Sequence, residues 1–112
     1  MSSDRRVYPR VLVDRQVGVI QSTGDLAYCR ASDISMGGIA LRCDYSADVG
    51  QQFDIFLNLP NADQVKRFEA RVRVAYVHYI GTECKHRIGM QYLKFKGDSQ
   101  EVLSNFLSER LR

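Results

Sequence analysis

Apolar and polar residues alternate along most of the chain, with the period of two that is typical of β-strands with one buried face. The clearest example is residues 66–79, where the alternate positions from Phe68 to Tyr76 are apolar and most positions between them are charged. Turn-forming residues separate this stretch from five others of the same kind. The pattern predicts six strands, at residues 11–21, 26–32, 39–43, 52–59, 66–79 and 87–95.

The period changes near the C-terminus. From Val102 to Leu111 the apolar residues follow helical spacing, which predicts an amphipathic helix over residues 98–112. Asp98, with Glu101 three residues later, resembles the capping box that starts many helices. An amphipathic helix must bury its apolar stripe, so we expect this one to pack on the outside of the strands or over an open end.

Six short strands without helices between them predict an all-β fold, namely a six-stranded antiparallel β-barrel with a C-terminal α-helix packed on the barrel. A length of 112 residues, 45% of them hydrophobic, fits a single folded domain over residues 1–112. Within it we expect a flexible arginine arm at residues 1–10, the barrel at 11–95 and the helix at 98–112. A small barrel is filled by its own side chains, so a ligand would bind outside it or at its rim.

Composition and charge narrow the classes of function. The formal net charge of +3 permits an anionic partner without demanding nucleic acid. No apolar run approaches the roughly 20 residues of a membrane span, and no signal-peptide core opens the chain, so we expect a cytoplasmic location and no membrane span. Cys29, Cys43 and Cys84 lack the spacing of a disulfide framework or a zinc site and are expected to be reduced structural thiols.

Signals of catalysis are missing from the sequence. It contains no P-loop, no nucleophile elbow and no zinc-protease motif, so we expect no enzyme activity and no cofactor. His78 and His86 lack the spacing of metal ligands and are expected to be structural or exposed. Arg71 and Arg73 are expected to be solvated strand residues, and Tyr76 is expected to belong to the core.

Residues 33–38 carry more polar chemistry than a plain turn needs. Asp33 accepts hydrogen bonds, and Ser35 can both donate and accept. Gly37 and Gly38 permit unusual backbone angles and let a ligand approach the main chain. This stretch is therefore a candidate binding loop.

A second polar stretch lies upstream. Arg5, Arg6 and Arg10 place three guanidiniums within six residues, and a guanidinium forks onto phosphate oxygens and onto the guanine edge. Loop and arm together suit an anionic ligand with hydrogen-bonding rings, such as a nucleotide.

Read in order, Arg6-x-x-x-Arg10 and Asp33-x-Ser35-x-x-Gly38 resemble the two-part signature of PilZ domains, bacterial receptors for the second messenger cyclic di-GMP. The resemblance implies a six-stranded barrel with a trailing helix, and residues 87–93 look like the closing strand of that family. It also implies that the ligand lies between the arm and the loop, and that ordering of the arm relays the signal to an unidentified protein partner, with no DNA or RNA involved. The implied ligand-binding residues are Arg5, Arg6, Arg10, Asp33, Ser35, Gly37 and Gly38.

Arg5 directly precedes the first motif, and in that family an arginine there goes with binding of an intercalated ligand dimer. We therefore expect two molecules of cyclic di-GMP per chain. Two other functions stay open. One is a protein–protein adaptor of the same fold that works without ligand, and the other is a barrel that binds single-stranded nucleic acid. The second class needs a basic groove interleaved with exposed aromatic side chains, whereas most aromatic residues here fall on predicted inward faces.

Overall fold

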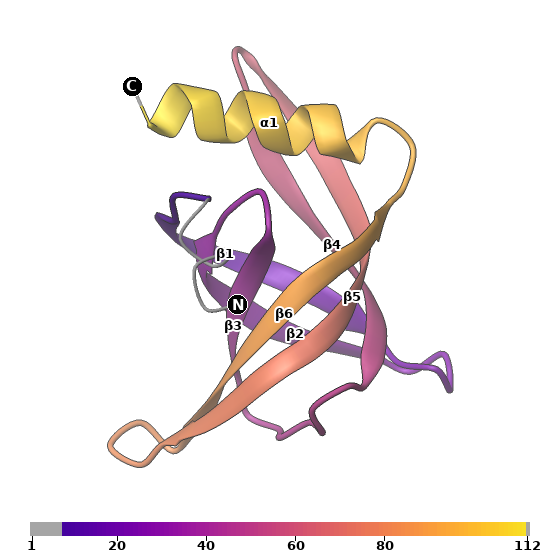
Figure 1. The fold of residues 1–112 in the computed structure, drawn as a ribbon, viewed down its shortest axis with the longest axis vertical. Coiled ribbons are helices and arrows are strands. Elements are labelled where there is room, and N and C mark those ends of the chain that lie inside the picture. The colour runs from indigo at the N-terminus through magenta and orange to yellow at the C-terminus, as the bar shows by residue number, and fades with distance from the viewer. Residues whose placement is uncertain (1–7, 112) are drawn as a thin grey trace.

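Six strands and one helix follow one another in the computed structural model, which describes residues 8–111 (Figure 1). They are β1 (Val11–Ile20), β2 (Leu26–Ile34), β3 (Gly38–Cys43), β4 (Gln52–Asn61), β5 (Gln64–Ile80), β6 (Lys85–Phe95) and α1 (Ser99–Arg110). All neighbouring strands are antiparallel, and the order β1-β2-β3-β6-β5-β4 closes into a barrel because β4 also pairs with β1. The predicted all-β barrel with one C-terminal helix is confirmed.

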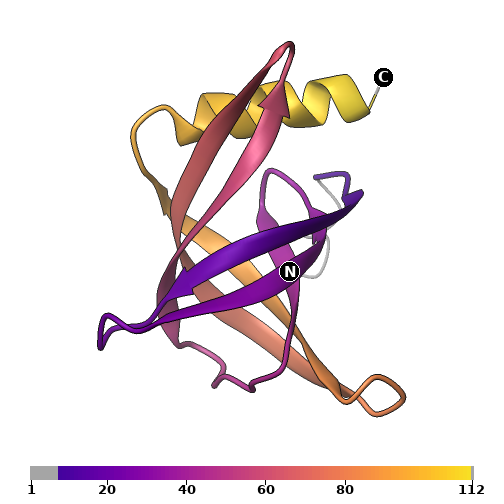
Figure 2. The same ribbon diagram turned by 180° about the vertical axis from the view of Figure 1, so that it is seen from behind.

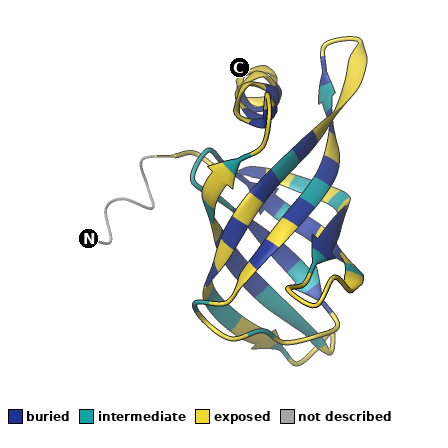
Figure 3. Cartoon of the chain, turned by 90° about the vertical axis from the view of Figure 1, so that its right-hand side faces the viewer, coloured by how far each residue is buried: buried dark blue, intermediate teal, exposed yellow. Residues whose placement is uncertain are grey.

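Buried residues alternate with more exposed ones along much of β4 and β5, as the colours of Figure 3 show. Phe68 on β5 is fully buried and lies in one core with the apolar faces of the other strands. Each such side chain contributes about 1.5–3 kcal/mol when it is removed from water, so the alternation in the sequence accounts for much of the inward face of the barrel. The largest of these fully buried residues on the strands are Val17, Ile34, Leu41, Ile55, Leu59, Phe68, Val72 and Val74.

The helix α1 packs on β4 and β5, across the end of the barrel where these two strands run beyond β1 (Figures 1 and 2). Its buried stripe consists of Val102, Leu103, Phe106 and Leu107. Asn61 at the end of β4 is also buried, and its Nδ2 donates to the backbone oxygen of Val102 at 3.1 Å. The strands therefore hold the helix by apolar packing and by a polar contact to its backbone.

The start of α1 differs from the predicted capping box. Asp98 occupies the cap position, but its side chain makes no capping hydrogen bond, so that prediction is wrong. The Oγ of Ser99 instead accepts a hydrogen bond from the backbone nitrogen of Glu69 on β5 at 2.9 Å. A contact between residues 30 positions apart ties the first turn to the barrel, and local spacing cannot reveal such a contact.

Several strand boundaries also differ from the predicted ones. β2 runs through Asp33 to Ile34 and β3 begins at Gly38, so the candidate loop shrinks to a tight turn at residues 35–37. β4 and β5 are joined by a turn at Ala62 and Asp63, where Ala62 has a φ of 55°. Every strand except β1, which ends one residue earlier, is longer than predicted, because residues near the strand ends still pair across the sheet.

Register shifts interrupt the regular pairing at four places, and two of these β-bulges lie at Ala75 and Ser32. On β5, Val74 pairs with Met90 whereas Tyr76 pairs with Gly89, which leaves Ala75 as the extra residue. The bulge reverses the alternation, so Val77 packs on the core and Tyr76, which we expected in the core, lies on the outer side.

The second bulge lies on β2. There Ala31 pairs with Leu41 but Asp33 pairs with Ala40, which leaves Ser32 as the extra residue. The alternation is again reversed, so that Ala31 and Ile34 are in the core and Asp33 opens toward the outer side.

The cysteines are not as expected. Cys29 on β2 and Cys43 on β3 form a disulfide, with their Cα atoms 4.9 Å apart, so the expectation of reduced thiols is wrong for this pair. The pairing of Arg30 with Arg42 places these cysteines opposite each other, which their separation of 14 residues does not reveal. Cys84 is a free, exposed thiol rather than a buried one. Among residues 8–111, no helix is long and apolar enough to cross a membrane.

Candidate ligand-binding site

A row of four paired residues crosses the outer face of the barrel from β2 to β5. Asp33 pairs with Ala40 on β3, Ala40 pairs with Gly89 on β6, and Gly89 pairs with Tyr76 on β5. The two middle residues are small and the two outer ones are large, so the row forms the floor and the two walls of a groove. The groove has a volume of about 660 Å³, which is within the usual range for small-molecule sites.

Several predicted site residues line this groove. Arg10, Asp33, Ser35, Gly37 and Gly38 all contribute to its lining. The lining also includes Tyr8, Tyr76 and Gln91, which the sequence did not single out as site residues. Arg5 and Arg6 lie outside the described residues.

The wall at Tyr76 depends on Gly89. A Cβ at position 89 would overlap the ring of Tyr76, so the ring can lie over β6 only because this residue is glycine. Tyr76 is thereby brought to the groove, where the planar ring of a ligand could stack on it. The residues on either side of Gly89, Ile88 and Met90, belong to the core.

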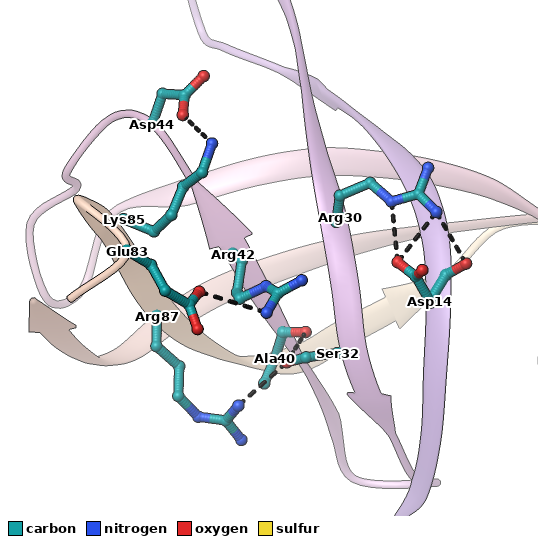
Figure 4. A network of polar contacts seen from close by, with 9 residues as sticks. All are labelled: Asp14, Arg30, Ser32, Ala40, Arg42, Asp44, Glu83, Lys85 and Arg87. Carbon is teal, nitrogen blue, oxygen red and sulfur yellow. Dashed lines mark hydrogen bonds and ion pairs between the residues drawn. The ribbon is translucent and has the colours of Figure 1, made fainter. Parts of the chain in front are cut away.

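The opposite wall carries the acidic group of the site. Asp33 is only 6% exposed, and its Oδ2 accepts a hydrogen bond from Nη2 of Arg87 at 2.5 Å. Figure 4 shows that Arg87 also extends to Ser32, whose Oγ accepts from Nη1 at 3.0 Å. Burial lowers the pKa of Arg87, but its hydrogen bonds to Asp33 and Tyr76 outweigh that effect and hold the pKa above its ordinary value. The buried carboxylate is therefore partnered by a permanent cation.

The turn between β2 and β3 is held by Ser35. Its Oγ accepts hydrogen bonds from the backbone nitrogens of Gly37 at 3.1 Å and Gly38 at 3.2 Å. The backbone nitrogen of Ser35 also donates to the backbone oxygen of Gly38 at 2.9 Å. Ser35 thus shapes the turn, and it lines the groove at the same time.

Gly37 in the turn and Gly38 at the start of β3 are both in close contacts. A Cβ at Gly38 would overlap the backbone oxygen of Met90 on the neighbouring strand. A Cβ at Gly37 would lie 2.8 Å from Cδ2 of Tyr8, so the ring of Tyr8 rests against the turn. The side chain of Tyr8, just ahead of β1, therefore packs on the turn, and Arg10 follows two residues later in the lining of the groove.

A buried hydroxyl lies on the core side of the site. The OH of Tyr92 on β6 is buried, and no hydrogen-bond partner for it is found among residues 8–111. Burial raises the pKa of this hydroxyl, and the nearby charge of Asp33 raises it further. The ring itself packs edge-on against Phe68, with centroids 5.6 Å apart.

The sequence contained partial signals for the residues that were missed. Arg87 and Gly89 stand in the stretch that resembles a closing strand, but nothing in the order of residues shows that Arg87 reaches β2. Tyr76 follows the inward alternation of β5, and only the bulge at Ala75 reverses it. Arg71 and Arg73 do not line the groove, and within residues 8–111 no cluster of three or more His, Cys, Asp or Glu side chains could hold a metal ion.

Comparison with known proteins identifies the family of the chain. The family model for the PilZ domain matches residues 4–109 of the chain. No curated protein is similar enough in sequence to count as a relative.

Solved structures share the fold. The inhibitor of motility MotI/DgrA from Bacillus subtilis is 21% identical with a TM-score of 0.77, over 93% of this chain and 50% of that one. YcgR from Escherichia coli in complex with c-di-GMP is 17% identical with a TM-score of 0.74, over 94% of this chain and 45% of that one. The PilZ domain of the same YcgR with c-di-GMP is 18% identical with a TM-score of 0.64, over 96% of this chain and 92% of that one. The chain thus spans about half the length of the first two proteins, and at these identities the likeness concerns the fold.

Proposed function

The chain belongs to the PilZ domain family, and on that premise we propose that it is a receptor for cyclic di-GMP that binds the dinucleotide in the groove between Asp33 and Tyr76. One observation carries the proposal. The described residues of both sequence motifs, Arg10 from the first and Asp33, Ser35 and Gly38 from the second, line a single groove. Two of the similar structures are described as complexes with c-di-GMP, which supports the same ligand here.

The chemistry of the groove matches the ligand. Cyclic di-GMP presents two phosphates and two guanines, and an arginine can fork onto either. Arg10 is exposed at the edge of the groove, and no ion pair holds it among the described residues. We assign it to a phosphate or a guanine edge, together with Arg5 and Arg6 from the preceding residues.

Asp33 and Tyr76 would receive a base between them. A carboxylate has two oxygens, so Asp33 can keep Arg87 on Oδ2 and accept a guanine N–H on Oδ1. Tyr76 offers a ring on which the base can stack, a contact worth about 1–3 kcal/mol per base. Ser35, Gly37 and Gly38 would keep the turn close to the ligand without blocking it.

The relay of the signal is part of the proposal. Binding would order the arginine arm over the groove and so change the surface that a downstream protein meets. Arg5 would serve a second ligand molecule, giving two molecules of cyclic di-GMP per chain. The receptor would bind and release its ligand without chemical conversion, in the cytoplasm where the second messenger is found.

Calorimetric titration of the chain with cyclic di-GMP tests the proposal. We expect saturable binding at about two ligands per chain, with little loss when short oligonucleotides are added as competitors. Binding to nucleic acid would instead weaken steeply with added salt. A ratio near one ligand per chain would support the receptor and contradict the binding of a ligand dimer. No binding by a chain shown to be folded would refute the receptor and favour the ligand-independent adaptor.

A further inference from the structure

One arginine joins the two walls of the groove. Arg87 donates from Nη2 to Asp33 Oδ2 at 2.5 Å, from Nη1 to Ser32 Oγ at 3.0 Å and from Nε to the OH of Tyr76 at 3.2 Å. Ser32 and Asp33 belong to β2 and Tyr76 belongs to β5, so one guanidinium from β6 contacts both sides. Arg87 is not itself part of the groove lining. It is therefore linked to the groove through its hydrogen bonds to Asp33 and Tyr76.

The order of strands explains why this residue must be long and forked. β3 lies between β6 and β2, and at a spacing of about 4.8 Å per strand the two backbones are roughly 10 Å apart. The Oγ of Ser32 donates to the backbone oxygen of Ala40 at 3.2 Å, which leaves its lone pairs free to accept from Arg87 (Figure 4). A lysine could supply the charge and three N–H donors, but these all start from one nitrogen, whereas Nε, Nη1 and Nη2 of the arginine each reach a different acceptor.

The burial of Asp33 explains why the contact matters. A carboxylate that is mostly removed from water needs a partner of opposite charge and hydrogen bonds to both oxygens. Arg87, whose side chain is 30% exposed, supplies that partner and fixes which oxygen remains for another donor. The orientation of Asp33 in the groove is thus set by β6 and not by its own strand alone.

We infer that Arg87 is a positioning residue for the ligand. It holds the carboxylate of Asp33 and the ring of Tyr76 in the orientation that accepts a guanine, and it acts through these two side chains without touching the ligand. This assignment rests on the proposed function, because it concerns the same groove and the same ligand.

A double-mutant cycle tests the assignment with cyclic di-GMP as the probe. Arg87→Gln should lower the affinity by about tenfold or more, since it removes charge-assisted hydrogen bonds that orient the site. In an Asp33→Asn background, the same change should cost less than about threefold, because the group through which Arg87 acts is already altered. Arg87→Lys should recover only part of the loss. Thermal melts of each variant show whether it is folded.

Arg42→Gln is the matched control. Arg42 lies directly opposite Arg87 in the pairing of β3 with β6, and its guanidinium pairs with Glu83 at 3.3 Å, away from the groove (Figure 4). We expect this variant to keep the affinity of the unaltered chain. Equal losses from Arg42→Gln and Arg87→Gln would overturn the assignment, since they would point to the general charge of this face.

A measurement without ligand separates this inference from the proposed function. In nitrogen-15 NMR spectra of the free chain, the Nε–H signal of Arg87 should shift on Tyr76→Phe and on Asp33→Asn. A signal that responds to neither change would overturn the network itself. Additive losses in the affinity cycle, with binding by the unaltered chain, would overturn only the positioning role. No binding by the unaltered chain would overturn the proposed function and this role with it.

Discussion

The ring of Tyr76 on β5 lies over Gly89 on β6, in contact so close that no Cβ fits between them. The two residues are cross-strand partners, and the ring fills the space that a side chain at position 89 would take. This contact turns an otherwise flat stretch of the barrel surface into one wall of a groove.

Gly89→Ala should therefore displace the ring. Because the ring is a movable side chain, the fold should survive with a loss of about 1 kcal/mol in the free energy of unfolding. The affinity for cyclic di-GMP should fall by about tenfold with the loss of a stacking surface. Chemical denaturation and calorimetry measure the two effects.

Gly81→Ala is the control for this change. Gly81 lies in the loop between β5 and β6, and the nearest atom to an added Cβ, Cε2 of Tyr79, would be 3.7 Å away. Affinity should stay the same in this variant. Unchanged affinity in Gly89→Ala as well would show that the ring of Tyr76 does not contact the ligand.

Arg10→Ala should lower the affinity for cyclic di-GMP by about tenfold to a hundredfold, because a charge-assisted fork to the ligand is lost. The melting temperature should change little, since Arg10 is exposed ahead of β1. Arg30→Ala is a suitable control, because Arg30 is an exposed arginine whose partner is Asp14 rather than the groove. Normal binding by Arg10→Ala would mean that the site assignment is wrong.

Arg5→Ala tests the ligand dimer. If Arg5 serves the second molecule, calorimetry should show the ratio of ligand to chain fall from about two to about one while the first molecule still binds. A ratio of two ligands per chain in this variant would show that Arg5 is not needed for the second molecule. A ratio of one in the unaltered chain would show that no ligand dimer binds.

Tyr92→Phe should leave stability unchanged or raise it, against the usual result of a change near the core. The hydroxyl is buried, and among residues 8–111 nothing accepts or donates to it. An unpaired buried polar group costs about 1–3 kcal/mol, so its removal should raise the free energy of unfolding by up to about 1 kcal/mol. A clear loss of stability would show that the hydroxyl makes a contact after all.

The same residue predicts a pH dependence. Burial and the charge of Asp33 raise the pKa of Tyr92 above its ordinary value of 10.0. Above about pH 10 the unfolded chain loses this proton while the folded chain keeps it, so the free energy of unfolding should fall as the pH rises. Denaturation curves of Tyr92→Phe should show a smaller alkaline loss than those of the unaltered chain. Parallel curves would contradict the raised pKa.

The disulfide predicts the number of reactive thiols. In denaturant without reductant, thiol titration should find one group, Cys84, and three after reduction. Loss of the Cys29–Cys43 bond should lower the free energy of unfolding by about 2–4 kcal/mol. Three reactive thiols before reduction would contradict the disulfide and support the reduced cysteines expected from the sequence.

The sequence by itself determined the fold class and identified residues on the Asp33 side of the groove. Alternation of apolar residues predicts the six strands, because a side-chain period of two is that of the extended backbone of a β-strand. The change to helical spacing after Gly97 predicts the helix. The turn at Ser35 also follows from local chemistry, since a hydroxyl next to two glycines can close its own hydrogen bonds.

Tertiary structure decided which residues line the groove. Strict alternation would place Asp33 on the same side as Ala31, and Tyr76 on the same side as Val74, both inside the barrel. One extra residue in each strand, Ser32 in β2 and Ala75 in β5, turns both side chains outward to opposite walls. A bulge is defined by the pairing of two strands rather than by either strand alone. The contact of Arg87 with β2 across β3 likewise depends on the order of the strands in the barrel. These features therefore have no signature in the order of residues.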